Sequence, residues 1–252
     1  LCTMQENQKN VNACWHKSNI CKMSLETIHD PSNLSRLYFD NNVKTWTPYV
    51  ARESLDVCVC GEDRGRGLIA RKDLPAGQCL LVIPPTVAVP VERVCDDAQE
   101  DTLEHVAEQV LLQEMQTAIH EKNVAIANSF LVLEGSSGKN VRIPSVECLL
   151  GLDETGPLLQ EDLTEDDLRQ IIRRNAFGPD FWTFSSIVRN LPKRPNRILG
   201  LYPLADMMNH SCQPNTVRVF VGEYMVVHTS TTIAAGEEIV SSYVPPTFSY
   251  PQ

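Results

Sequence analysis

The chain has 252 residues, of which 42% are hydrophobic and 21% are charged, and its formal net charge is −10. This composition is typical of one globular domain of about 150–200 residues with an appendage, and no stretch approaches the roughly 18–20 apolar residues of a membrane-spanning helix. The excess of acidic residues disfavours direct binding to DNA or RNA, since proteins that bind the phosphate backbone are normally basic, and it suits a basic protein partner instead.

Residues 1–48 form a polar, weakly patterned N-terminal flank. The pattern permits one amphipathic helix within residues 24–39, although Pro31 interrupts it. The nine cysteines are scattered and odd in number, and no charged-then-apolar signal sequence is present. We therefore expect reduced thiols and a location in the cytoplasm, the nucleus or both.

Residues 49–90 have the pattern of β structure. A strand is predicted at 57–60, a turn rich in glycine and charge at 61–67, and a second strand at 68–70. The continuous apolar run at 79–83 predicts a third strand that is buried on both faces.

The following stretch changes to a helical period. Apolar residues recur at helical spacing between 94 and 128, which predicts an amphipathic helix. Thr164, followed by the acidic residues 165–167, is typical of a helix start.

The last part of the chain returns to β structure. Residues 217–221 and 225–228 flank Gly222-Glu223, which predicts a hairpin, and 239–243 predicts a short strand. The order of strands, then helices, then strands predicts an α+β fold that is mainly β.

The same pattern defines the expected organisation of the chain. One domain is predicted over 49–246, with a helical insert at about 94–180, and 247–252 forms a C-terminal tail. No internal repeat is present.

Three segments carry candidate chemistry, and each is ambiguous by itself. The glycines of Gly65-Arg66-Gly67 indicate a tight turn or a close approach of the backbone to another group, and they are not a dinucleotide fingerprint. His210 and Cys212 would share one face of a strand. A buried histidine, a Cys–His nucleophile and a metal ligand are three readings of that pair, and Tyr243 alone fits either a packed aromatic or a functional phenol.

Together and in this order, the segments resemble the signatures of SET-domain lysine methyltransferases. The matching residues are Gly-Arg-Gly-Leu at 65–68, Asn-His-Ser-Cys-x-Pro-Asn at 209–215 and Gly-Glu-Glu-Ile-x-x-Ser-Tyr at 236–243. The helical insert and Arg-Asn-Ala-Phe at 174–177 resemble the SET-and-MYND branch and the related proteins that join tetratricopeptide repeats to a SET domain. The resemblance covers about residues 50–246.

The resemblance implies a fold of small sheets around a pseudoknot, in which the chain near Tyr243 passes the Asn209–His210 segment. It also implies S-adenosyl-L-methionine as the cofactor and a lysine of a histone or non-histone protein as the substrate. Tyr243 would be the catalytic residue. The implied cofactor-binding residues are Gly65, Arg66, Gly67, Asn175, Asn209, His210 and Tyr243.

That assignment agrees with the chemistry of methyl transfer to an amine. The lysine pKa near 10.4 leaves roughly one side chain in a thousand as free amine at neutral pH, so a narrow apolar channel that lowers this pKa would help. A phenol and nearby carbonyl groups would orient the amine toward the methyl group, and positioning would supply much of the rate. The chemistry requires no metal, and we expect no metal site.

Two features of the SET-and-MYND branch have no counterpart in the sequence. The region 91–175 holds two cysteines and two histidines at spacings unlike those of a MYND zinc finger. Nine residues follow Tyr243 and none is cysteine, so the cysteine-rich segment that closes the lysine channel is missing and Cys212 is expected to be a bare thiol. Three explanations stay open: the chain is a fragment, its activity is reduced, or a partner completes the site.

These absences keep a second function open, that of a catalytically weak or inactive SET module acting in protein binding or transcriptional regulation in chromatin. A Cys–His hydrolase built on His210 and Cys212 is a third alternative.

Overall fold

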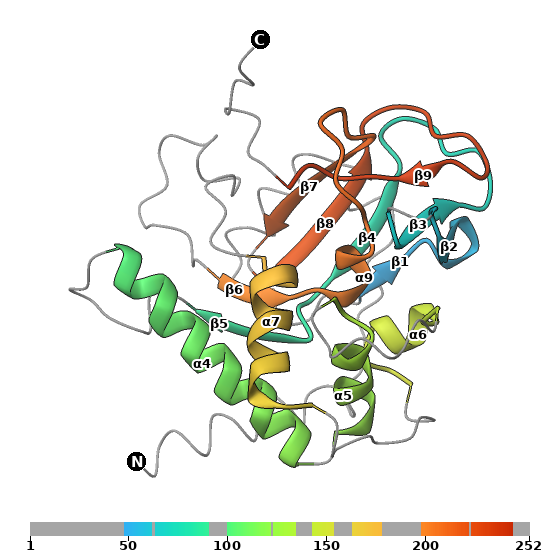
Figure 1. Cartoon of the computed structure of the whole chain (residues 1–252). Coiled ribbons are helices and arrows are strands. Elements are labelled where there is room, and N and C mark those ends of the chain that lie inside the picture. The colour runs from blue at the N-terminus through green and yellow to red at the C-terminus, as the bar shows by residue number, and fades with distance from the viewer. Residues whose placement is uncertain are drawn as a thin grey trace, which may run out of the picture. The chain divides into compact units, whose positions relative to one another are not determined.

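A computed structural model describes residues 48–61, 64–90, 100–121, 123–134, 143–153, 163–177, 198–221 and 223–243 (Figure 1). The helix expected within 24–39 and the tail at 247–252 lie outside these described residues. The proposed domain boundaries therefore stay a prediction.

The first strands form a small three-stranded sheet in the order β2-β3-β9. β2 (Leu55–Val59) and β3 (Arg66–Ala70) are antiparallel neighbours, and the Cys60 N–H donates to the Gly65 carbonyl at 2.7 Å to close the turn between them. β9 (Glu238–Ile239) joins β3 from the far end of the chain. The strand predicted at 239–243 is wrong in extent. Pairing with β3 ends at Ile239, and Ser241 then forms a bridge with His210 instead.

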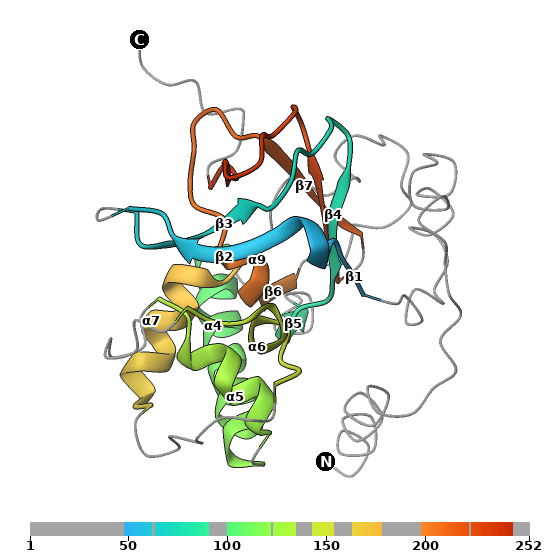
Figure 2. The same cartoon turned by 90° about the vertical axis from the view of Figure 1, so that its right-hand side faces the viewer.

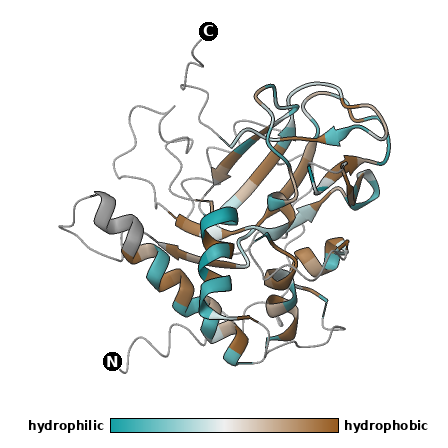
Figure 3. Cartoon of the chain, viewed as in Figure 1, coloured by the Kyte–Doolittle hydropathy of each residue, from teal (hydrophilic) through white to brown (hydrophobic). Residues whose placement is uncertain are grey.

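A four-stranded antiparallel sheet has the order β1-β4-β8-β7. Every residue of β4 (Cys79–Ile83) is buried, as the unbroken apolar run predicts, and Figure 3 shows this strand and its neighbour as largely hydrophobic. The predicted hairpin is confirmed. The remaining strands of this sheet are β1 (Tyr49–Val50), β7 (Thr216–Val221) and β8 (Tyr224–Thr229).

The helical insert forms several helices, which lie together on one side of the strands in Figures 1 and 2. The pattern between 94 and 128 divides into two helices, because the Asn123 side chain accepts from the Ile126 N–H at 3.2 Å and starts a new helix. The helices are α4 (Glu100–His120), α5 (Val124–Leu131), α6 (Val146–Leu149) and α7 (Glu165–Asn175). None of the helices in the described ranges combines the length and the apolar character that crossing a membrane requires.

A single apolar core joins the helices to the sheets. Phe130 of α5, Met115 of α4 and Leu81 of β4 are each no more than 1% exposed. Burial of side chains of this size stabilises a fold by about 1.5–3 kcal/mol each. The core also holds the two-stranded sheet of β5 (Val87–Pro90) and β6 (Ile198–Leu201), so the strand that leads into the short helix α9 (Pro203–Asp206) is fixed in place.

The start of α7 is a capping box, as Thr164 and the acidic residues after it predict. The Thr164 hydroxyl accepts from the Asp167 N–H at 3.2 Å, and the Asp167 carboxylate accepts from the Thr164 N–H at 2.9 Å. Two backbone donors at the helix start are therefore satisfied by side chains.

We expect Thr164→Ala to lower the free energy of unfolding by about 1 kcal/mol, because the alanine cannot accept from the Asp167 N–H. Urea unfolding followed by circular dichroism measures the change. Thr164→Ser is the matched control, since serine retains the hydroxyl and should stay within about half a kcal/mol of the original chain. Equal stability of the alanine and serine variants would contradict the role of the cap.

Candidate active site

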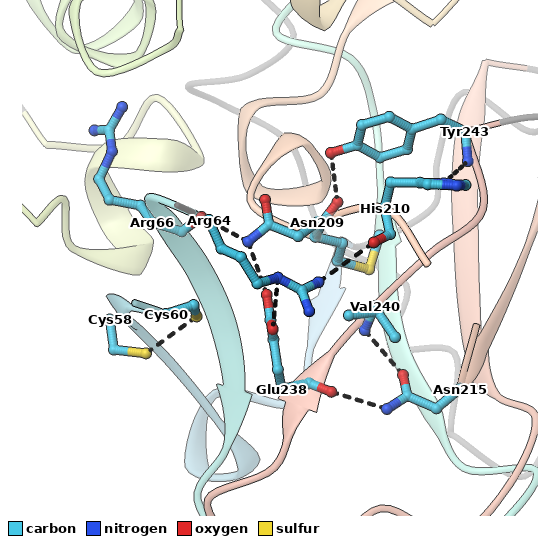
Figure 4. A network of polar contacts seen from close by, with 11 residues as sticks. Cys58, Cys60, Arg64, Arg66, Asn209, His210, Asn215, Glu238, Val240 and Tyr243 are labelled. Atoms are coloured by element: carbon cyan, nitrogen blue, oxygen red, sulfur yellow. Dashed lines mark hydrogen bonds and ion pairs between the residues drawn. The ribbon is translucent and has the colours of Figure 1, made fainter. Parts of the chain in front are cut away.

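Three segments that are far apart in the sequence meet at the Asn209 side chain (Figure 4). Its amide donates to the Arg66 carbonyl of β3 at 3.1 Å and to the Glu238 carboxylate of β9 at 2.7 Å. Asn209 follows α9 (Pro203–Asp206), a short helix that begins directly after β6. The structure thus brings together the glycine turn, the Asn-His segment and the Gly-Glu-Glu segment that the sequence singled out.

Positions 65 and 67 of the turn require glycine for different structural reasons. Gly65 has φ of +64°, a backbone conformation that favours glycine, and a Cβ there would meet no atom within 4 Å. A Cβ on Gly67 would lie 2.5 Å from Cys60 Sγ and 2.9 Å from Glu238 Oε1. The space left by Gly67 is therefore filled by side chains of this chain, and the open backbone of the turn lies at Gly65.

Glu238 is a central residue of the site to which the sequence analysis assigned no role. Its side chain is 18% exposed, and its second carboxylate oxygen lies 3.3 Å from Arg64 Nε. Arg64 in turn donates to the His210 carbonyl at 3.3 Å. Alternation along a strand places only one of two adjacent glutamates on a given face, and the sequence does not tell which of Glu237 and Glu238 faces inward.

The chain after β9 is held along the Asn-His segment by backbone hydrogen bonds. The Ser241 N–H donates to the Asn209 carbonyl at 3.0 Å, and the Ser211 N–H donates to the Ser241 carbonyl at 3.0 Å. These bonds form a parallel bridge between His210 and Ser241. The adjacency that the resemblance implied for these segments is confirmed.

The Asn215 side chain extends this pairing. Its amide nitrogen donates to the Glu238 carbonyl at 2.8 Å, and its amide oxygen accepts from the Val240 N–H at 2.9 Å. A side-chain amide thus takes the place of a paired peptide group, and the backbone polar groups of β9 are satisfied where the ladder stops.

Tyr243 lies against His210. Its backbone N–H donates to His210 Nδ1 at 3.0 Å, and its hydroxyl donates to the Met208 carbonyl at 2.9 Å. The two ring centroids are 5.3 Å apart. Burial, and then the nearby carboxylate of Asp206, raise the pKa of the Tyr243 phenol above its ordinary value, so the phenol is a neutral hydrogen-bond donor at physiological pH.

His210 and Cys212 contact each other, although not as neighbours on a strand face. The segment turns after His210, and Cys212 Sγ lies 3.4 Å from His210 Nε2. Because Nδ1 accepts a backbone N–H, the neutral ring carries its proton on Nε2. That nitrogen then faces the thiol as a donor and cannot accept its proton, which disfavours the Cys–His hydrolase alternative.

Asn175 and the Arg66 side chain lie in a separate part of the site. Asn175, the last residue of α7, donates to the Glu134 carbonyl at 2.7 Å and to the Ile171 carbonyl at 2.8 Å. Burial lowers the pKa of the Arg66 guanidinium, and the Glu134 carboxylate partly opposes this effect. Figure 4 shows the Arg66 side chain directed away from Asn209, so only the backbone of Arg66 joins the first group.

A buried carboxyl group lies beside Tyr243. Asp206, at the end of α9, precedes Met208 by two residues, and its Oδ2 is buried without a hydrogen-bond partner among the described residues. Burial raises the pKa of this carboxyl well above its ordinary value, and Arg218 and the Tyr202 backbone partly oppose the shift. The described residues contain no cluster of three or more metal-ligating side chains.

The family model for the SET domain matches residues 65–244, and the chain belongs to the SET-domain family. The α+β, mainly β fold class is confirmed. Among the relatives, protein-lysine N-methyltransferase SMYD4 of Mus musculus is 41% identical over 46 residues, which are 18% of this chain and 6% of that protein. Histone-lysine N-methyltransferase ASHR1 of Arabidopsis thaliana is 45% identical over 51 residues, which are 20% of this chain and 10% of that protein.

The matched stretches therefore span about a tenth or less of these relatives. Among solved structures, the SET domain of LSMT bound to lysine and AdoHcy covers 89% of this chain and 55% of that chain, with 16% identity and a TM-score of 0.39. The assignment to the family depends on the family model and not on this structural likeness.

We expect Gly67→Ala to lower the free energy of unfolding by about 1–3 kcal/mol, because the added methyl group overlaps Cys60 and Glu238. Denaturant unfolding of the purified variant measures the loss. The same substitution in a Cys60→Ala background should cost less, since one of the overlapping groups is gone. A Gly67→Ala variant as stable as the original chain would show that the close approach at Gly67 is wrong.

Proposed function

We propose that this chain is a protein-lysine N-methyltransferase that takes its methyl group from S-adenosyl-L-methionine. The proposal is carried by one observation: the glycine turn, the Asn209–His210 segment and the Tyr243 phenol converge from three distant parts of the chain. Membership of the SET-domain family and the names of its relatives support protein-lysine methylation at the level of the family. They do not favour the alternative of a non-catalytic binding module.

The residues at the site fit the cofactor. Gly65 leaves open backbone where a Cβ would meet nothing within 4 Å, and an adenosyl group can approach such a turn closely. Many polar groups of Asn209 and His210 already have partners within the chain, so the remaining lone pairs of their carbonyls and of the Asn209 side-chain oxygen would serve the amino-acid and adenine parts of the cofactor.

When it is bound, the cofactor supplies an electrophilic methyl group on a sulfonium. The residues of this chain would position the target amine. The neutral Tyr243 phenol already donates to the Met208 carbonyl, so the hydroxyl and the carbonyl together offer polar groups that can hold an amine in one orientation.

The substrate is proposed by charge alone. The formal net charge of −10 favours a basic segment of a histone or of a non-histone protein, and the cytoplasm and the nucleus are the proposed locations. Asn175 stays a proposed cofactor contact; its amide donates to the Glu134 carbonyl, and the carboxylate of the same Glu134 acts on the charge of the Arg66 guanidinium.

We expect Tyr243→Phe to reduce methyl transfer at least about a hundredfold, because loss of the hydroxyl removes an orienting group for the amine. Incubation with methyl-labelled cofactor and a panel of histones and other basic proteins measures the transfer. Calorimetric affinity for the cofactor should change less than about threefold, since one peripheral hydrogen bond contributes little. Tyr49→Phe, on β1 away from the site, is the matched control and should retain full activity.

Undiminished transfer by Tyr243→Phe would contradict the catalytic role of the phenol. Absence of cofactor binding at millimolar concentration in the original chain would favour the non-catalytic module instead.

A further inference from the structure

The thiols of Cys58 and Cys60 lie next to each other, immediately before the glycine turn in the chain. Cys58 of β2 and Cys60, which follows that strand, have their Sγ atoms 3.5 Å apart (Figure 4). Residues two apart on an extended chain face the same side. Both cysteines are partly exposed and β2 is an edge strand of its sheet, so reagents from solvent can reach the pair.

The Cys60 thiol is connected to the proposed cofactor site. Burial, and then contacts with Cys58 and the Glu238 carboxylate, raise the pKa of Cys60 to about 12. The same carboxylate accepts from the Asn209 amide at 2.7 Å. The Cys60 N–H also closes the turn that contains Gly65, at 2.7 Å from its carbonyl. A change at Cys60 therefore acts on Glu238 and on the glycine turn together.

We propose that Cys58 and Cys60 form a reversible intramolecular disulfide, and that this modification weakens binding of S-adenosyl-L-methionine. The proposed effect on cofactor binding rests on the proposed function, whereas the disulfide itself does not. The proposed oxidant class is a small organic disulfide. The Cys58 thiolate attacks it and releases one small thiol. Cys60 then gives up its proton and displaces the other small thiol, a step that its raised pKa makes slow. Two protein thiols thus become one disulfide while the reagent is reduced to two thiols.

The sulfur atoms must move to make this bond. A disulfide holds its sulfurs about 2 Å apart, so the Cys58 and Cys60 sulfurs must approach each other and Cys60 loses the proton that it offers to Glu238. The Glu238 carboxylate then loses the Cys60 donor. Movement of Cys60 also displaces the turn at Gly65 and the Arg66 carbonyl to which the Asn209 amide donates. The loss of about one hydrogen bond corresponds to a change of up to about tenfold in affinity.

The experiment uses the full chain, reduced with dithiothreitol or treated with glutathione disulfide. Peptide mapping by mass spectrometry should find Cys58 and Cys60 in one peptide that has lost two hydrogen atoms. Calorimetry should give a dissociation constant for S-adenosyl-L-methionine about three- to tenfold higher in the oxidised protein, restored by dithiothreitol.

Two variants separate this site from the other thiols. Cys58→Ser leaves Cys60 in contact with Glu238 but prevents the disulfide. The affinity of this variant for S-adenosyl-L-methionine should therefore not change on treatment with glutathione disulfide. Cys212→Ser removes the exposed thiol beside His210, and the response to oxidation should persist in it.

Stable glutathione adducts on single cysteines with no intramolecular bond would overturn the proposed modification. A mapped disulfide with unchanged cofactor affinity would overturn its proposed effect. If the reduced chain binds no cofactor, the proposed function fails, while the mapped disulfide still decides whether the two thiols pair.

Discussion

One partly buried carboxylate holds the candidate site together. The Glu238 side chain contacts Asn209 at 2.7 Å and Arg64 at 3.3 Å, and it also meets the Cys60 thiol. These partners come from two segments of the chain, the turn between β2 and β3 and the Asn-His segment, and Glu238 itself belongs to a third. A charged group that is 82% shielded from solvent costs free energy unless its lone pairs are satisfied, so the arrangement of the three segments is favoured because it supplies those partners together.

The backbone then extends what the carboxylate begins. Ser241 pairs with the peptide groups on either side of His210, and Asn215 satisfies the backbone where β9 ends. The Tyr243 N–H reaches His210 Nδ1 at the end of this paired stretch. The position of the phenol is thus fixed by a series of backbone contacts, and the orientation and tautomer of His210 are fixed with it.

The regular elements were predicted best. The buried strand at 79–83, the hairpin around Gly222 and the cap at Thr164 depend on local patterns, and all three are confirmed. The convergence of Asn209, His210 and Tyr243 was expected only through the family resemblance, because pairing between residues 30 or more apart has no local signal.

The missed features depend on packing in three dimensions. Glu238 could not be separated from Glu237 without the direction of its strand, and the reason for Gly67 could not be known without its neighbours Cys60 and Asn209. Asp206 gave no signal because its burial arises from the elements around α9.

Replacing the Glu238 carboxylate tests the account most directly, with calorimetric titration of S-adenosyl-L-methionine as the measurement. Glu238→Gln keeps the size of the side chain and removes its charge, and we expect binding at least about tenfold weaker, because charge-assisted hydrogen bonds contribute about 1.5–3 kcal/mol each. Glu237→Gln, at the exposed neighbour whose carboxylate accepts from the Ala234 N–H, should bind as the original chain does. A folded Glu238→Gln variant with unchanged affinity would contradict the account.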